Sequence, residues 1–183
     1  MLIKLQGQYL LNLVTDRIRK LTDEIVIATS PEQYAVVKSI AGNERIVVDL
    51  VPGRAAMGGI YTGLHTARNT LCLVVGCDMP LLNLDLIQYM IDEVNIFDIV
   101  VPRIGQYVEP LHAIYSKNCM PIISDMIEKN NLKIYELLNR VNTRYISDEE
   151  IDRFDPQHMS IFNINTREAF DMALVLMKRK KHD

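Results

Sequence analysis

The sequence has no long hydrophobic run and no strong net charge, and both absences narrow what the protein can be. No apolar segment approaches the roughly 18 residues that a membrane-spanning helix needs, and no signal-peptide pattern is present. The formal net charge is −3, and the one basic cluster, Lys178 to Lys181, is typical of a solvated helix end. We therefore expect neither a membrane nor a nucleic acid as partner.

Cysteine is scarce and odd in number, with Cys72, Cys77 and Cys119 as its three occurrences. This usage favours reduced thiols in a cytoplasmic protein, and cysteine and histidine are too scattered for a zinc site. At 183 residues, 49% of them hydrophobic and 23% charged, the chain suits one domain, residues 1–183, with a sizeable core.

Strand and helix patterns alternate along the chain. Residues 24–29 and 45–48 predict strands, and Ser30 and Pro31 between them predict the capped start of a helix that reaches Ile40. This order is typical of a parallel βαβ unit. Elsewhere in the chain, the patterns predict strands at 98–101, 108–115 and 144–146. They predict helices at 9–21, 83–94, 116–128, 133–139 and the C-terminus, and a surface turn at 148–155.

A short buried strand predicted at residues 71–76 locates a candidate metal and nucleotide site. The run is apolar and rich in valine, it is followed by Asp78, and Pro80 stops the ladder from continuing. A carboxylate at the carboxyl edge of a parallel sheet can hold Mg²⁺ against nucleotide phosphates. The alternative is that Asp78 caps the helix that starts near Asn83, or closes a turn.

Glycine is concentrated in residues 51–64, which hold four of the eight glycines. Glycines ahead of a helix would let the backbone approach a ligand and would supply unpaired N–H groups, although a plain loop explains them equally well. The segment contains neither a Walker A loop nor the dinucleotide-binding fingerprint.

Two other polar features have competing explanations. His112 favours a structural role, because no nucleophile near it in sequence completes a catalytic triad. Asn163 and Asn165 alternate with Phe162 and Ile164, which would place both amides on one side of an extended segment, where they could bind a polar heterocycle. Alternatively, one amide caps the last helix and the other closes an Asx-turn, and Thr166 is a further candidate cap.

Several motifs occur together in one order. They are Asp49 with Pro52-Gly53, Met57-Gly58-Gly59-Ile60-Tyr61-Thr62-Gly63-Leu64, Cys77-Asp78-Met79-Pro80, Glu109-Pro110-Leu111-His112 and Phe162-Asn163-Ile164-Asn165-Thr166. The ordered set resembles the molybdenum cofactor guanylyltransferases over residues 2–170. The resemblance implies an α/β, three-layer Rossmann-like nucleotidyltransferase fold with a mostly parallel mixed sheet.

The resemblance also implies an activity and roles for individual residues. GMP would pass from GTP to a molybdopterin-type cofactor with release of pyrophosphate and with Mg²⁺ as cofactor, and molybdoenzyme-maturation proteins would be partners. Asp78 would be the catalytic, metal-binding and nucleotide-binding residue; Asp49, Gly58 and Gly59 would bind the nucleotide, and Asn163 and Asn165 the pterin.

The N-terminus of the sequence departs from the family pattern. The family opens with an apolar strand and a loop of the form L-A-G-G-x-S-x-R-M-G-x-D-K, whereas the first residues of this sequence match the family segment on the C-terminal side of that loop. We expect an N-terminally truncated domain whose first strand, between the strands at 24–29 and 71–76, is missing. Without the loop's arginine and lysine, we expect this chain to be a weak or inactive enzyme, since each donor to developing charge contributes about 10²–10³ in rate.

Two other functions fit the sequence, one enzymatic and one not. A related nucleotidyltransferase could use CTP or another acceptor, because the base-reading loop is absent. A non-catalytic pterin-binding or adaptor variant could have lost the triphosphate loop and kept the pterin side.

Overall fold

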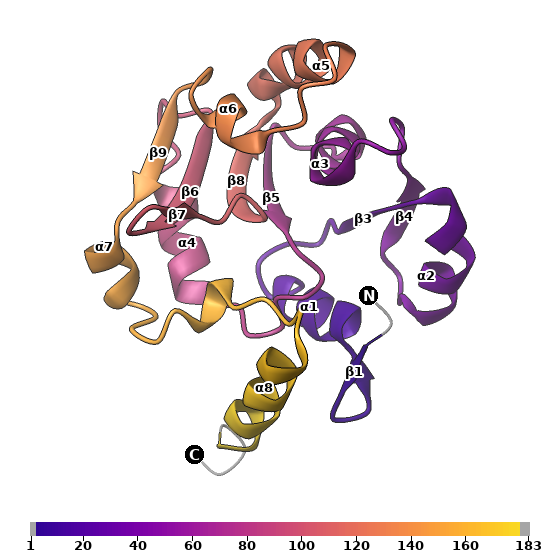
Figure 1. The fold of residues 1–183 in the computed structure, drawn as a ribbon, viewed down its shortest axis with the longest axis vertical. Helices are drawn as coiled ribbons and strands as arrows, with labels where there is room; N and C mark the ends of the chain where they lie inside the picture. The colour runs from indigo at the N-terminus through magenta and orange to yellow at the C-terminus, as the bar shows by residue number, and fades with distance from the viewer. Residues whose placement is uncertain (1–2, 180–183) are drawn as a thin grey trace.

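A mixed sheet of five strands and a separate pair of parallel strands form the centre of the protein (Figure 1). The computed structural model describes residues 3–179. The strands are β1 Lys4–Leu5, β2 Gln8–Tyr9, β3 Val26–Thr29, β4 Arg45–Val48, β5 Leu71–Val75, β6 Ile99–Ile104, β7 Tyr107–Val108, β8 His112–Ser116 and β9 Thr143–Ile146. The helices are α1 Leu10–Ile18, α2 Tyr34–Ile40, α3 Ala55–Thr66, α4 Leu84–Asp92, α5 Met120–Glu128, α6 Ile134–Leu138, α7 Asp148–Asp152 and α8 Arg167–Arg179.

Strand directions in the larger sheet follow from its pairings. β8 is antiparallel to both β5 and β6, while β9 is parallel to β6. β5, β6 and β9 therefore share one direction and β8 opposes them, with the short β7 folded back on β6. The expected mixed α/β sheet is confirmed.

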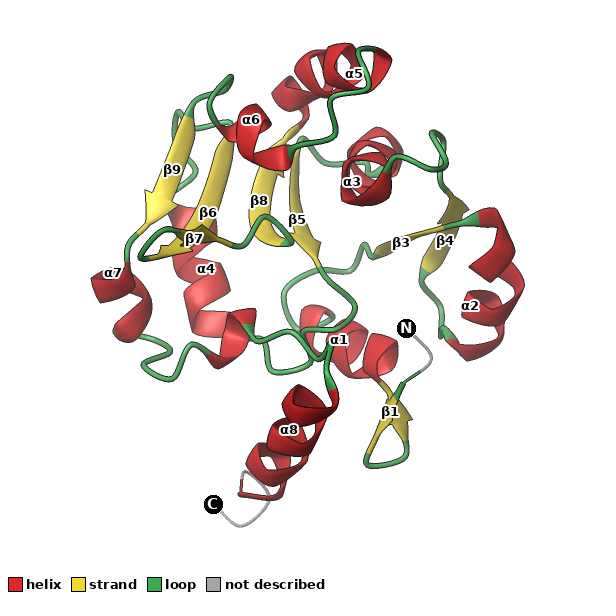
Figure 2. Cartoon of the chain, in the orientation of Figure 1, coloured by secondary structure: helices red, strands yellow, loops and turns green. Residues whose placement is uncertain are grey.

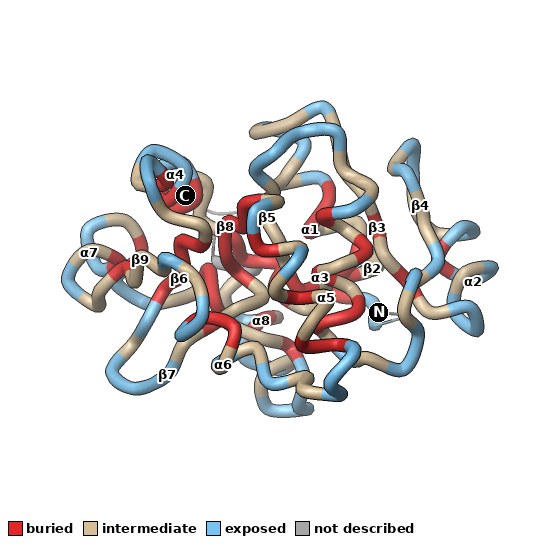
Figure 3. The backbone as a smooth tube through the Cα atoms, turned by 90° about the horizontal axis from the view of Figure 1, so that it is seen from above, coloured by how far each residue is buried: buried red, intermediate tan, exposed pale blue. Residues whose placement is uncertain are grey.

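Helices cover both faces of this sheet, which gives three layers (Figure 2). Side chains alternate along each strand, so neighbouring residues enter different cores. Tyr115 of β8 packs with α3, α5 and α6, whereas Ile114 packs with α4 and α7. Figure 3 shows buried residues concentrated in β6 and β8, with exposed residues around the periphery. The sheet therefore has a hydrophobic core on each of its two faces.

The sheet is interrupted between β3 and β5. β3 and β4 form a parallel pair joined through α2, so the predicted βαβ unit is confirmed. Among the described residues, β3 pairs with β4 alone and β5 with β8 alone, so the two edges that face each other lack hydrogen-bonded neighbours. α3 contacts both β3 and β5 and bridges the interruption. This is where the family resemblance places the absent strand.

Some local predictions were wrong. Ser30 makes no side-chain cap, and residues 31–33 form a 3₁₀ turn ahead of α2. Residues 148–152 form α7 rather than a turn, because Ser147 and Glu150 make a reciprocal capping box and Ile151 is buried. The sequence patterns also missed the hairpin of β1 and β2.

The two ends of the described chain pack together, because Leu5 and Leu10 share a buried cluster with Ala173 of α8. α8 continues to Arg179, and the last two residues of the predicted basic cluster, Lys180 and Lys181, lie outside the described residues. Within residues 3–179, no helix combines the length and apolar character needed to cross a membrane.

Candidate active site

Asp78 lies just beyond the end of β5, as the sequence predicts, and its side chain is half-buried. A Cβ at Gly76 would come within 2.6 Å of Asp78 Oδ1, so the glycine leaves room for the carboxylate. No hydrogen bond or ion pair reaches this carboxylate from residues 3–179. The helix-capping alternative is wrong, because Asn83 caps α4 by accepting from the Leu86 N–H at 3.0 Å.

The segment that carries the two predicted asparagines runs directly beside Asp78. The Ile164 N–H donates to the Asp78 carbonyl oxygen at 2.9 Å. Asn163 is half-buried and Asn165 is exposed. The cap of α8 is Thr166, whose hydroxyl accepts from the Ala169 N–H at 3.1 Å, so neither asparagine side chain serves as that cap.

A buried acid, Glu109, joins this segment to β7 and β8. Its side chain is 4% exposed, and its Oε2 accepts from Asn163 Nδ2 at 3.0 Å and from the Tyr107 hydroxyl. Its Oε1 accepts from the Leu111 N–H at 3.1 Å. Sequence reasoning assigned no role to Tyr107 or Glu109. The available signal was an acid in a mostly apolar stretch, next to Pro110.

Asp49 lies in a different environment, at the end of β4. Its Oδ1 accepts from the Thr62 hydroxyl at 2.7 Å, and that hydroxyl accepts from the Leu50 N–H at 3.0 Å. These bonds tie Asp49 to α3. In the described part of the chain, no hydrogen bond or shared partner connects Asp49 with Asp78.

Gly58 and Gly59 lie inside α3, so the prediction that these glycines precede a helix is wrong. The Gly58 N–H donates to the Arg54 carbonyl oxygen at 3.1 Å, so it is not free for a phosphate. A Cβ at Gly58 would lie 3.0 Å from the Val51 carbonyl oxygen, whereas a Cβ at Gly59 would meet nothing within 4 Å. The glycine at 58 therefore allows close packing of the loop before α3.

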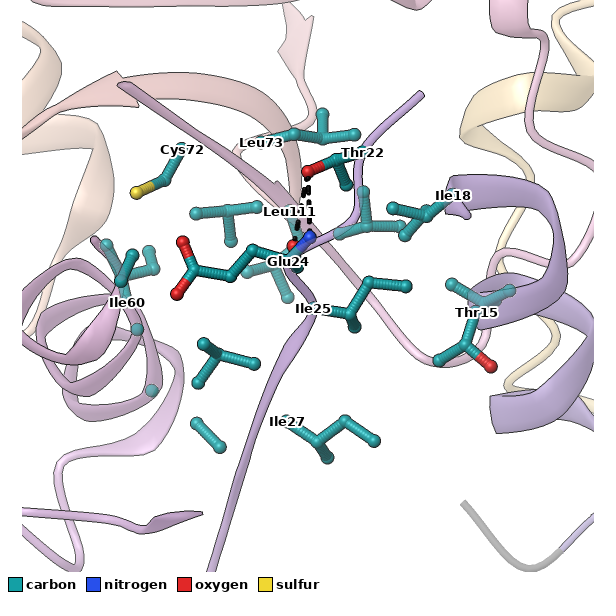
Figure 4. Close-up of a pocket in the computed structure, with 18 of the residues that line it drawn as sticks. Thr15, Ile18, Thr22, Glu24, Ile25, Ile27, Ile60, Cys72, Leu73 and Leu111 are labelled. Atoms are coloured by element: carbon teal, nitrogen blue, oxygen red, sulfur yellow. Dashed lines mark hydrogen bonds between the residues drawn. The ribbon is translucent and has the colours of Figure 1, made fainter. Parts of the chain in front are cut away.

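A cavity of about 430 Å³ occupies the interruption between β3 and β5 (Figure 4). α1 lines it on one side and α3, including Gly59, on the other. Most of the lining is apolar. Glu24 is the one charged side chain that residues 3–179 contribute to it, and its carboxylate accepts from the Arg68 N–H at 3.0 Å. Because a triphosphate needs cationic or N–H partners, this apolar, acid-bearing space is poorly suited to hold one.

His112 has the structural role that the sequence favours. It is fully buried, its Nε2 lies 2.7 Å from Ser160 Oγ, and burial lowers the pKa of the imidazole to about 4. Ser160 Oγ also accepts from the Asn83 N–H at 2.8 Å, and the Ser160 N–H donates to Asp155 Oδ2 at 2.6 Å. This clamp joins β8, the start of α4 and residues 159–161, and so fixes the entry to the Asn163 segment.

The residues present can accommodate one divalent cation only in part. Among residues 3–179, no group of three or more His, Cys, Asp or Glu side chains gathers at a point. Mg²⁺ commonly uses one or two carboxylates and takes its other ligands from water and substrate phosphates. The half-exposed Asp78 carboxylate, which lacks a protein partner in this region, fits that limited role.

Comparison with solved structures places this architecture among nucleotidyltransferases. The 2-C-methyl-D-erythritol 4-phosphate cytidylyltransferase of Thermus thermophilus has a similar fold, with a TM-score of 0.70 and 12% identity over 97% of this chain and 92% of its own. The molybdopterin-guanine dinucleotide biosynthesis protein A of Archaeoglobus fulgidus is more similar, with a TM-score of 0.85 and 25% identity over 97% and 90% of the two chains.

Sequence comparison identifies the family. The model described as the MobA-like NTP transferase domain matches residues 1–144, and the chain belongs to this family. It is 32% identical over 174 residues to the "Probable molybdenum cofactor guanylyltransferase" of Peptoclostridium acidaminophilum, covering 91% of this chain and 76% of that protein. The resemblance drawn from the ordered motifs is confirmed.

Proposed function

We propose that this protein transfers GMP from GTP to the terminal phosphate of a molybdopterin-type cofactor. An acceptor phosphate oxygen forms a bond to the α-phosphorus of GTP, the bond from that phosphorus to the bridging oxygen breaks, and pyrophosphate leaves with the electron pair. The observation that carries the proposal is the unpartnered, half-exposed Asp78 carboxylate beside the Asn163 segment, in a chain of the MobA-like family.

Asp78 would hold Mg²⁺ in this reaction. When bound, the ion would neutralise charge on the triphosphate and on the departing pyrophosphate. Asn163 and Asn165 would bind the pterin of the acceptor, and the hydrogen bond from Ile164 to Asp78 would keep the acceptor segment next to the metal ligand. The protein thus aligns two phosphates and supplies little covalent chemistry itself.

Asp49, Gly58 and Gly59 are the residues proposed to help bind the nucleotide. Asp49 would contribute through the end of β4, and Gly58 and Gly59 through the shape of α3 rather than through free N–H groups. We propose that turnover is slow, since no lysine or arginine among residues 3–179 lines the cavity beside α3. We also propose that molybdoenzyme-maturation proteins receive the product from this protein.

Asp78→Asn tests the metal and nucleotide role, with Asp23→Asn as matched control because Asp23 is exposed. GTP with Mg²⁺ should raise the melting temperature of the parent chain and of Asp23→Asn, and should not protect Asp78→Asn. Pyrophosphate release in the presence of molybdopterin should follow the same order. Equal Mg²⁺-dependent protection of Asp78→Asn by GTP contradicts the proposal.

The nucleotide and the catalytic class are tested in the same format. Protection by GTP that exceeds protection by CTP, each with Mg²⁺, supports a guanylyltransferase, and the reverse order supports a cytidylyltransferase. Pterin binding that persists without any metal-dependent nucleotide binding by the parent chain would instead identify a non-catalytic binding protein.

A further inference from the structure

Glu109 is a buried acid whose partners are all neutral. Its three donors are a hydroxyl, a side-chain amide and a backbone N–H, and no ion pair involves it within the described residues. Burying a carboxylate is costly unless hydrogen bonds compensate, so its presence needs an explanation. The two side chains that it binds, Tyr107 and Asn163, come from distant parts of the sequence and share one oxygen, Oε2.

The carboxylate determines which way the Asn163 amide points. An ionised carboxylate only accepts hydrogen bonds, so the Asn163 NH₂ group must face it and the Oδ1 must face away. No donor from residues 3–179 reaches this Oδ1. Glu109 thus presents Asn163 as a hydrogen-bond acceptor next to Asp78, oriented before any ligand arrives.

The same carboxylate anchors the ring of Tyr107. The side chain is 55% exposed although its hydroxyl is bound to the buried acid. Burial and this hydrogen bond raise the pKa of Tyr107 to about 12, so the hydroxyl stays protonated as a donor. The negative charge of Asp78 also raises the pKa of Tyr107, as the smallest of these effects. An aromatic ring held at one end with its body exposed can serve as a stacking surface.

We propose that Tyr107 and Asn163, both fixed by Glu109, form a subsite for a planar fused heterocycle with N–H donors on its edge. The ring of Tyr107 stacks on the heterocycle and Asn163 Oδ1 accepts from its edge, while Glu109 is a positioning residue that touches no ligand. The inference rests on the proposed function, where the heterocycle is the pterin of the acceptor, and it adds Tyr107 and Glu109 to that function.

The first experiment measures binding of a fluorescent probe, pterin-6-carboxylate, to the full chain by quenching. Tyr107→Leu should weaken binding about 3- to 10-fold, the range of an aromatic pair, while Tyr107→Phe keeps the ring and should retain most of the affinity. Tyr135→Leu is the matched control, because Tyr135 is a 68% exposed tyrosine on α6 whose hydroxyl makes no hydrogen bond to Glu109. Unchanged affinity in Tyr107→Leu overturns the inference.

The second experiment separates positioning from folding. Glu109→Gln should raise the KM for the pterin acceptor about 10-fold and leave the KM for GTP unchanged, because the glutamine amide no longer dictates the orientation of Asn163. A purely structural role predicts a lower melting temperature with both KM values unchanged, or both altered alike, and either pattern overturns the positioning role.

Failure of the inference is distinguishable from failure of the proposed function. If Asn163→Ala weakens pterin binding while Tyr107→Leu and Glu109→Gln do not, the acceptor site stands and the new subsite is wrong. If Asn163→Ala and Asp78→Asn leave pterin and GTP binding intact, the proposed function itself is wrong.

Discussion

Gly58 and Gly59 are neighbours in α3 whose replacement by alanine should have opposite effects on stability. Alanine is favoured over glycine in a helix interior by about 1 kcal/mol, and this gain applies to both positions. At Gly59 the new methyl group would meet nothing within 4 Å, so the gain should appear in full. At Gly58 it would lie 3.0 Å from the Val51 carbonyl oxygen and 3.2 Å from Arg54 Cβ.

The magnitude at Gly58 follows from that crowding. Forcing an extra methyl group against backbone typically costs about 1–3 kcal/mol, which cancels or exceeds the helical gain. For a chain of 150–250 residues, each kcal/mol shifts the melting temperature by about 2–4 °C. Gly59→Ala should therefore melt about 2–4 °C above the parent, and Gly58→Ala at or below it.

Urea unfolding followed by circular dichroism measures the difference directly. Gly63→Ala is the internal control, because its Cβ also meets nothing within 4 Å and it should behave like Gly59→Ala. The denaturant slope should be the same in all variants, so that midpoints report stability alone. Equal stabilisation by Gly58→Ala and Gly59→Ala would refute the close approach between α3 and the preceding loop.

Three further predictions concern the clamp, the cap of α7 and the metal ligand. The pKa of His112 is about 4 when folded and 6.5 normally, so the folded state resists protonation, and stability should fall by about 3 kcal/mol as pH drops from 6.5 towards 4. His112→Gln should flatten that part of the profile, and an unchanged slope in urea titrations contradicts the assignment. Glu150→Gln keeps an acceptor for the capping box but removes the charge that pairs with Arg144, and it should cost about 1 kcal/mol at pH 7. Because the pKa of Glu150 is lowered to about 2, this contribution is present above pH 4.5 and should disappear as pH falls through 2; a pH-independent difference would count against it. Gly76→Ala should displace the Asp78 carboxylate, abolishing Mg²⁺-dependent protection by GTP with little change in melting temperature, and retained protection would argue against the placement of Asp78.

Local sequence signals predicted the elements that depend on neighbouring residues. The apolar run of β5 and the proline at position 80 located the end of the strand and Asp78 without any knowledge of the fold. The βαβ unit of β3, α2 and β4 followed from alternation and a proline at the start of the helical segment. Each of these signals lies within a few residues of the feature that it predicts.

Glycine density was misleading at α3. Four glycines in a short segment suggested either a ligand-binding loop or a plain loop ahead of a helix, yet Met57, Ile60 and Leu64 are buried at helical spacing against the sheet. The burial of these side chains outweighs the intrinsic cost of glycine in a helix. Similarly, the acidic segment after Ser147 looked like a turn, although the S-x-x-E pattern of a capping box was present in the sequence.

The predicted site was incomplete because its parts are distant along the chain. Glu109 and Asn163 are separated by 54 residues, and the pairing depends on how the segment after residue 159 crosses the edge of the sheet. No spacing rule reveals such a contact. The clamp of His112 and Ser160 was missed for the same reason, since the serine lies 48 residues further on.

The interruption between β3 and β5 also determines how the molecule opens. Strand-to-strand hydrogen bonds usually propagate cooperativity across a sheet, but here α1 and α3 provide the connection through side-chain packing. The unit of β3, α2 and β4 can therefore separate without breaking a ladder to β5. Its amides should exchange with solvent deuterium at a lower opening free energy than those of β5 and β8, which makes this flank the first foldon to detach.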